Sequence, residues 1–284
     1  MTLIIMRNIE ADIKKQLVPQ LAAFLIFSAF GTVSLFAQED IPESTYVDLT
    51  VVTYNIHHGE GVDDLYSAIR IARTLEQYKP DLVALQAVDM GTNRTEGDLQ
   101  INIIANHLGM FYVFGKTIDY LGGEYGNAIL SKYPIISTQN IDISPGITSE
   151  RRGLLRATID IGFRTLKFYS TQFGIMDEEQ KYHSKRLGSV FKRLMNNEPI
   201  IFCGDLNAEP YSVQLTPLMN QLMDIGTRFR NVTNTYPTPL MSRRIDYILI
   251  NNQVEPFYYS VPVDTLSMVA SNHLPVVAKV RITP

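Results

Sequence analysis

The sequence predicts a large α/β domain in which mixed β-sheets are covered by helices. Strand-like and helix-like segments alternate in the first half of the chain, which favours strands joined by helices. The middle and the end carry strand-like segments joined by short links, which favours antiparallel neighbours in the same sheets. With 45% hydrophobic and 19% charged residues, the composition is that of an ordinary globular protein.

The first half of the chain contains two predicted strands and two predicted helices. Residues 47–55 form a strand, and residues 63–78 form a helix that Pro80 closes. The apolar positions of that helix recur at helical spacing, at Leu65, Ile69, Ala72 and Leu75. A short apolar run over 82–87 predicts a buried strand, and residues 98–109 form a second helix that ends at a glycine.

The second half is richer in strands. In chain order, we expect strands within residues 126–135, 154–161, 165–173, 199–203, 244–250 and 274–280. The clearest helix covers 177–195, where three acidic residues suit the positive end of the helix dipole. A further helix is predicted around 212–223.

The first 37 residues differ from the rest of the chain. Basic residues precede an apolar run over 21–36, and Ala37 precedes a polar segment. This pattern predicts a signal peptide over residues 1–37 and a mature domain over residues 38–284. The alternative is an uncleaved N-terminal membrane anchor, although the apolar run is short for a bilayer span. Both alternatives predict an exported protein that is periplasmic, secreted or membrane-anchored.

The charge balance limits the partners. The formal net charge is −4 at pH 7, so the chain offers no basic surface for non-specific binding of nucleic acid. Nucleic acid is therefore disfavoured as a partner. Membrane contact is expected only through the N-terminal segment, if that segment is not removed.

Several polar side chains stand where a predicted buried strand begins or ends. They are Asn55, Asp205, Asn207, Asp246, Asn272 and His273. A polar group at a buried strand end is costly unless it is paired, so each is a turn-former or a site residue. Taken singly, none of them identifies a site.

Their order along the chain is more informative. The segments TYNIHHG, DLVALQ, GNAILSKYPI, RGLLRATI, STQF, GDLNAEP, RIDYILI and SNHLPVVAKV follow one another. In this order the chain resembles the endonuclease/exonuclease/phosphatase superfamily, whose members are similar to DNase I, over about residues 48–282. The resemblance implies a four-layer sandwich of two mixed β-sheets flanked by helices. It also implies hydrolysis of phosphodiesters or phosphomonoesters with Mg²⁺ or Mn²⁺.

The resemblance assigns roles to five residues. His273 matches the catalytic histidine, and Asp246 matches the aspartate that accepts a hydrogen bond from it. Asp205 and Asn207 match the pair that orients the nucleophile and holds the phosphate. Asn55 matches an asparagine at the metal, which Asp205 also approaches. Phosphate esters repel an attacking hydroxide, so this chemistry needs a cation, a base and further hydrogen-bond donors.

Three positions depart from the family pattern. Ala87 stands where the family has the glutamate that is its principal metal ligand. Gln172 stands for a histidine that binds phosphate or donates a proton, and Asn272 stands for an aspartate at the metal. Two anionic groups are therefore lost beside the cation, and Gln172 cannot transfer a proton. Asp89 and Glu124 are possible substitute ligands.

These departures leave more than one interpretation of function. We expect a non-catalytic or strongly attenuated relative whose cleft is retained for a phosphorylated or similar small molecule, with no metal required. The alternative is an active Mg²⁺- or Mn²⁺-dependent phosphoesterase with a rearranged metal site. A nuclease is disfavoured by the acidic charge. His57 and His58, which a related subgroup also shows, are expected either to line the pocket or to pack.

Overall fold

The chain is described by a computed structural model over residues 46–146, 150–194, 198–230 and 233–284. The predicted signal peptide or anchor, residues 1–37, lies outside the described residues. Within the described ranges, no helix has both the length and the apolar character needed to cross a bilayer.

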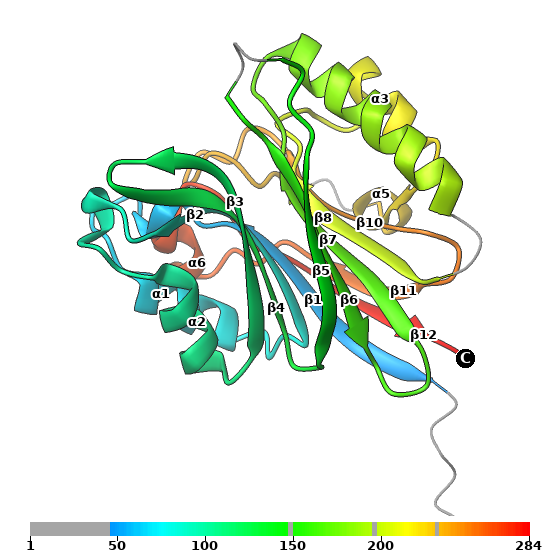
Figure 1. Cartoon of the computed structure of the whole chain (residues 1–284), viewed down its shortest axis with the longest axis horizontal. Helices are drawn as coiled ribbons and strands as arrows, with labels where there is room; N and C mark the ends of the chain where they lie inside the picture. Colours follow the sequence, from blue (N-terminus) through cyan, green and yellow to red (C-terminus); the bar gives the residue numbers. More distant parts are fainter. Residues whose placement is uncertain (1–45, 147–149, 195–197, 231–232) are drawn as a thin grey trace, which may run out of the picture. The chain divides into compact units, whose positions relative to one another are not determined.

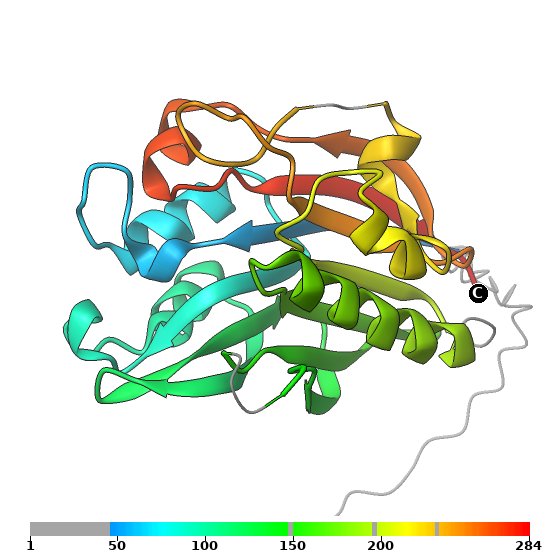
Figure 2. The same ribbon diagram turned by 90° about the horizontal axis from the view of Figure 1, so that it is seen from above.

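Two six-stranded mixed sheets form the centre of the fold (Figures 1 and 2). In the first sheet β1 and β2 are parallel and the other neighbours are antiparallel. Its strands, in order across the sheet, are β11 (Glu255–Ser260), β12 (Val276–Ile282), β1 (Val47–Asn55), β2 (Leu82–Met90), β4 (Gly123–Ser131) and β3 (Phe111–Tyr120).

The second sheet repeats this arrangement. Only β7 and β8 are parallel, and the other pairs are antiparallel. Its strands, in order across the sheet, are β5 (Ile135–Asp142), β6 (Gly153–Asp160), β7 (Thr165–Gln172), β8 (Ile200–Asp205), β10 (Asp246–Ile250) and β9 (Met223–Asp224).

Helices cover the outer faces of both sheets, so the predicted four-layer sandwich is confirmed (Figure 1). The helices are α1 (Ala68–Glu76), α2 (Gln100–Leu108) and α6 (Thr265–Ala270) on the first sheet, with α3 (Asp177–Leu194) and α4 (Thr216–Met219) on the second. The short α5 (Ile225–Arg228) contacts β10 and β11. Three single-turn 3₁₀ helices are η1 (His57–Gly59), η2 (Asn93–Thr95) and η3 (Val213–Leu215).

Three apolar layers hold the sandwich together. The central layer joins the facing sides of the sheets, where Val51 and Ala84 of the first sheet meet Phe168 and Ile201 of the second. A second layer lies under α1 and α2, and a third lies under α3 and α4. Burial of this apolar area is the main stabilising contribution, and it leaves the polar strand ends at one edge.

Most predicted elements are present with shifted ends. The helix predicted over 63–78 begins only at Ala68, because the Ser67 hydroxyl caps it by accepting the N–H of Arg70 at 3.2 Å. The strand predicted over 82–87 continues to Met90 through a β-bulge. The strands predicted within 154–161 and 165–173 are β6 and β7, which pair antiparallel as a hairpin.

The helix predicted over 212–223 is wrong. The segment forms η3 and the four-residue α4, and Met223 begins the short strand β9. Pro217 explains the break, because a proline is tolerated in the first turn of a helix but not in its interior. The sequence also failed to indicate β3, β5, β11 and α6. In β5, for example, most side chains are exposed and no apolar alternation marks the strand.

Candidate active site

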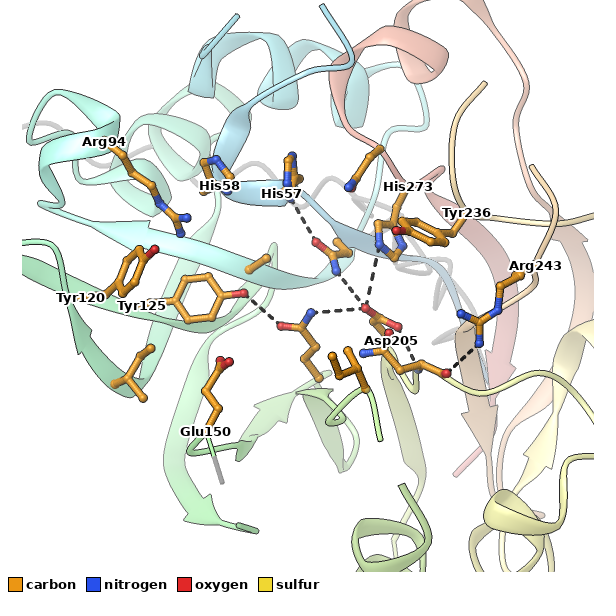
Figure 3. Close-up of a pocket in the computed structure, with 17 residues that line it drawn as sticks. His57, His58, Arg94, Tyr120, Tyr125, Glu150, Asp205, Tyr236, Arg243 and His273 are labelled. Carbon is orange, nitrogen blue, oxygen red and sulfur yellow. Dashed lines mark hydrogen bonds and ion pairs between the residues drawn. The ribbon is translucent and has the colours of Figure 1, made fainter. Parts of the chain in front are cut away.

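Strand ends from both sheets converge on one cavity (Figure 3). The parallel pairs β1–β2 and β7–β8 bring their carboxyl ends to the same edge. Asp246 is opposite Asp205 across β10 and β8, and Val276 is opposite Thr53 across β12 and β1. Because β10 and β12 run antiparallel to these neighbours, they begin where β8 and β1 end. The antiparallel register therefore places Asp246 beside Asp205 and brings the start of β12 to the same edge.

The cavity has a volume of about 440 Å³. Six of the residues predicted from sequence line it, namely Asn55, Gln172, Asp205, Asn207, Asn272 and His273. Asp246 lies behind His273 and reaches the cavity through that imidazole. Asp89 and Glu124 are not among the lining residues.

A buried group of three titratable side chains forms one wall. His273 Nδ1 lies 2.9 Å from Asp246 Oδ2, and His273 Nε2 lies 4.0 Å from Asp205 Oδ2. All three residues are at least 95% buried. A carboxylate can only accept a hydrogen bond, so His273 Nδ1 carries the proton in its contact with Asp246. The family resemblance implies the same direction.

The environment raises the pKa of two members of this group. Burial by itself lowers the pKa of His273, but the charge and hydrogen bond of Asp246, together with Asp205, raise it above 6.5. Burial, with a contribution from Asp246, raises the pKa of Asp205 above 3.8, against the opposing effects of His273 and Asn55. The two carboxyl groups therefore favour the protonated form of the imidazole.

Ala87 lies at the β-bulge in β2. The register between β2 and β4 shifts between Leu85 and Val88, and Ala87 has φ +58°. Ala87 lines the cavity, so the position that the family resemblance assigns to a metal-binding glutamate offers only a methyl group. The backbone keeps a left-handed conformation that is unfavourable for an alanine.

The amide side chains of the cavity are committed to protein partners. Asn55 donates from Nδ2 to Asp205 Oδ2 at 2.9 Å, and its Oδ1 accepts the His57 N–H at 3.1 Å. Gln172 donates from Nε2 to the same Asp205 oxygen at 3.3 Å. Gln172 Oε1 accepts from the Tyr125 hydroxyl and from Arg152. Gln172 Oε1 therefore accepts two hydrogen bonds, whereas Asn55 Oδ1 accepts one and keeps one lone pair.

The proposed substitutes for the lost glutamate are also engaged. Asp89 is completely buried, and both its oxygens are bound by Arg94, at 2.6 Å from Nε and 2.8 Å from Nη2. Glu124 lies on β4 with a half-exposed side chain, 3.3 Å from the ammonium of Lys116. Because the bulge breaks the alternation of β2, Asp89 does not share the orientation that an unbroken strand would give it.

Several lining residues were not indicated by the sequence. Arg94 reaches the cavity from η2 and lies over the ring of Tyr120, 4.6 Å from its centroid. Tyr236 lies against the imidazole of His273, with ring centroids 4.6 Å apart. Arg243 donates to the carbonyl of Asn207. Arg243 lies three residues before Asp246 in the sequence, and this proximity is the one feature that could have indicated that Arg243 lines the cavity.

His57 and His58 line the cavity, in agreement with the first of the two expected roles. They lie in η1, and both have φ +45°, which is unusual for two consecutive residues other than glycine. Burial, together with the charges of Arg94 and His57, lowers the pKa of His58 to about 4. The His58 ring is therefore neutral near pH 7.

The model of the Endonuclease/Exonuclease/phosphatase family matches residues 52–273. The chain therefore belongs to this family, which is typically dependent on a divalent metal. The uncharacterized protein YbhP of Escherichia coli is 24% identical over 250 residues, which cover 82% of this chain and 96% of YbhP.

Solved structures of the family share the fold. An endonuclease/exonuclease/phosphatase from Beutenbergia cavernae has a TM-score of 0.67 at 24% identity, over 83% of this chain and 72% of that one. A mannosyl-6-phosphatase from Bacteroides thetaiotaomicron has a TM-score of 0.65 at 19% identity, over 82% of this chain and 99% of that one. At this level of identity the likeness shows the architecture alone.

The residues present do not fit an oxygen-ligated Mg²⁺ site between β1 and β2. Mg²⁺ binding depends on carboxylate ligands, and Asp205 is the one lining carboxylate close to Asn55. Its Oδ2 already accepts from two amides, and the imidazole of His273, whose pKa is raised, lies 4.0 Å away. Asn272 Oδ1 is buried without a hydrogen-bond partner among the described residues, so one acceptor remains for a ligand that carries a donor.

Proposed function

We propose that this protein is an exported member of the family whose cleft binds a phosphorylated or similarly anionic small molecule, with hydrolysis absent or strongly attenuated. The observation that carries the proposal is the joint presence of Ala87, Gln172 and Asn272 around an intact Asp205–Asp246–His273 group. The apolar N-terminal segment supports export.

The charges support binding without a metal. Relative to the family pattern, Ala87 and Asn272 each remove one negative charge. The two substitutions together therefore change the net charge of the cavity by +2, which is the charge of one Mg²⁺. A phosphate in the metal-free cavity thus meets about the same net charge as it would in a metal-loaded relative. Its cationic partners would be the protonated form of His273 and the guanidinium of Arg243, which line the cavity, while the charge of Arg94 is balanced by Asp89.

The same substitutions disfavour catalysis. Gln172 cannot transfer a proton, and positioned acid–base groups contribute about 10²–10⁴-fold to rates. Without a cation, nothing at Ala87 polarises the phosphoryl oxygens or generates hydroxide near neutral pH. The site therefore retains the features that recognise an anion and lacks those that break the ester bond.

A second candidate is an active phosphoesterase with a rearranged metal site for Mg²⁺ or Mn²⁺. One observation favours it: Asp205, Asp246 and His273 offer ligand atoms that all lie within 4.8 Å of one another. A metal there would compete with the proton that His273 holds and with the amides bound to Asp205.

Binding and turnover are measured separately to test the proposal. The full chain is titrated by calorimetry with inorganic phosphate and mannose 6-phosphate in EDTA, because a structural neighbour is named as a mannosyl-6-phosphatase. It is then assayed with Mg²⁺ or Mn²⁺ against a panel of phosphoesters. We expect binding in EDTA and no turnover. Tight Mg²⁺ or Mn²⁺ binding with metal-dependent turnover by the wild-type chain, at a rate that the triple reversion does not exceed, would overturn the proposal in favour of the second candidate.

The reversion Ala87→Glu, Gln172→His, Asn272→Asp tests whether those three positions explain the lost activity. We expect Mg²⁺-dependent hydrolysis at least about 10²-fold above the wild type, since a metal and a proton donor are both restored. The matched control carries Ala87→Gln instead of Ala87→Glu, which keeps the size of the side chain but not the charge. Equal activity of the two triple variants would show that the carboxylate at position 87 is not the decisive loss.

A further inference from the structure

A second group of potential ligands includes His57 and His58, which line the cavity, and the neighbouring Glu60. His57, His58 and Glu60 each offer one ligand atom, and these atoms all lie within 4.8 Å of one another. Figure 3 shows the labelled rings of His57 and His58 next to each other, and their centroids are 4.4 Å apart. Neither the family resemblance nor the proposed anion site assigns a role to this group.

The spacing within the group approaches that of a coordination sphere. His58 Nε2 lies 3.5 Å from Glu60 Oε2. Two ligands of a tetrahedral zinc ion, bound at 2.0–2.1 Å, are separated by roughly 3.3 Å. A cation would therefore need only small rotations of these side chains to bind both atoms.

The ring of His57 is already oriented by a backbone carbonyl. His57 Nδ1 lies 3.3 Å from the carbonyl oxygen of Glu60, a contact in which the nitrogen must be the donor. This leaves the lone pair on Nε2. Histidine ligands of metals usually donate their second ring N–H to a carbonyl or a carboxylate in this way.

The loop that carries the group is held in place. Gln100 donates from Nε2 to the His58 carbonyl and accepts the Asp89 N–H at its Oε1. The Glu60 N–H donates to the His57 carbonyl at 3.0 Å. A ligand set on a fixed turn loses little conformational freedom when it binds a cation.

The positive charge of Arg94, which contributes to the low pKa of His58, opposes a cation here, and Asp89 offsets part of that charge. Both carboxylate oxygens of Asp89 are bound to this guanidinium, so the pair is neutral as a unit. Glu60 adds a negative charge on the outer side of the two rings. A dication between the rings and Glu60 would therefore face a neutral pair and a carboxylate.

We propose that His57, His58 and Glu60 bind one divalent transition-metal ion of the zinc type, with its remaining coordination position on the side of the cavity. Two imidazoles and one carboxylate form a ligand set that suits Zn²⁺ rather than Mg²⁺, which prefers oxygen ligands. Three protein ligands with one open position are typical of sites where the metal meets a small molecule. The site is independent of the proposed anion site, and each can fail alone.

Calorimetric titration of the full chain with ZnCl₂ and with MgCl₂, in the absence of phosphate, tests the site. We expect one Zn²⁺ per chain, bound at least 100-fold more tightly than Mg²⁺. His57→Asn and His58→Asn should each weaken Zn²⁺ binding at least tenfold. Asparagine is chosen because it tolerates the positive φ at both positions. The matched control is His107→Asn, since His107 forms a comparable pair with Glu76, at 3.0 Å, outside the cavity.

X-ray absorption of the zinc-loaded wild-type chain gives a test that needs no variant. We expect two imidazoles in the coordination sphere of the metal. One imidazole would place the ion at Asp205 and His273, which offer a single ring, and would overturn the proposal. Zn²⁺ binding that is unchanged in His57→Asn and in His58→Asn would also overturn the proposal. So would a loss of Zn²⁺ affinity in the control His107→Asn as large as the loss in those two variants. The phosphate titration is done in EDTA, so its result does not depend on this site.

Discussion

Two buried carboxylates beside the cavity, Asp89 and Asp246, are both completely buried and both paired, but with different partners. Asp89 is bound by Arg94, whose charge is permanent. Asp246 is bound by His273, whose charge depends on pH. The first pair lies beside the bulge that carries Ala87, and the second belongs to the wall that contains Asp205 and His273.

The two pairs therefore have different roles: the Asp89–Arg94 pair supports the structure, and the Asp246–His273 pair can take part in chemistry. The ion pair with the permanent charge of Arg94 fixes the end of β2 and η2. A histidine–aspartate pair can hold a proton toward a ligand and release it. The side of the cavity beside Ala87 therefore combines structural support with a methyl group, while the opposite side combines structural support with a titratable pair.

Removal of the permanent charge should have the largest effect. Arg94→Met leaves the buried Asp89 carboxylate without its cation, and we expect the free energy of unfolding to fall by about 3 kcal/mol, because breaking a buried pair costs about 3–5 kcal/mol and this guanidinium is a quarter exposed. Denaturant unfolding near pH 7 measures the loss. Arg73→Met, on the exposed side of α1, should change stability by less than about 0.5 kcal/mol.

Asp246→Asn sharpens this contrast. His273 can lose its proton when its partner is neutralised, so the destabilisation should be smaller than that of Arg94→Met. A larger loss for Asp246→Asn would show that the two pairs do not differ in the way their chemistry indicates.

The second expected effect is a pH dependence of stability and of anion binding that comes from the His273–Asp246 pair. The folded chain holds the His273 proton more tightly than a free imidazole, so its contribution to stability is complete below pH 6.5 and is lost as pH rises through the raised pKa. Anion binding should follow the same proton and weaken by up to about tenfold per pH unit above that pKa. Sulfate is the probe, because its charge does not change in this range.

The variant Asp246→Asn provides the control for the pH profile. Without the neighbouring charge that raises the pKa of His273, the midpoint of sulfate binding should move to lower pH. A profile that is the same in both chains would mean that another group controls binding. Competition calorimetry in EDTA from pH 5 to 9 measures the two midpoints.

The smallest effect concerns the backbone at Ala87. Its φ of +58° is unfavourable for alanine and natural for glycine. We expect Ala87→Gly to raise the free energy of unfolding by about 0.5 kcal/mol, the difference between relieved strain and added chain entropy. Ala84→Gly, at a buried extended position of the same strand, should lower it by about 1 kcal/mol. Equal losses at both positions would contradict a strained bulge.

The core of the fold could be predicted because its strands are marked by local patterns. The apolar runs in β2 and β8 and the apolar stripe of α3 are visible within each segment. The elements that were not predicted, such as β5, have exposed polar side chains and exist because a neighbouring strand pairs with them. The helix predicted over 212–223 is interrupted because Pro217 is tolerated only in a first helical turn, which leaves the short η3 and α4.

The site was predicted as a set of residues rather than as a geometry. Asn55, Asp205 and His273 were named from their order in the chain, and the structure brings all three to one cavity. The pairing of Asp89 with Arg94 was not indicated, because spacing along the chain does not show which way a side chain turns after a bulge. Glu124 was a plausible substitute ligand until its position on β4, beside Lys116, was known.

The sequence by itself determined the fold class, the family resemblance and the three departures at Ala87, Gln172 and Asn272, because periodicity and residue identity are local properties. Only the tertiary structure decided that the Asn55 and Gln172 amides converge on one oxygen of Asp205, and that His57, His58 and Glu60 lie within reach of one another. The contact between Asn55 and Asp205 spans 150 positions of the chain. Contacts of that kind depend on how two sheets pack, which no short stretch of sequence contains.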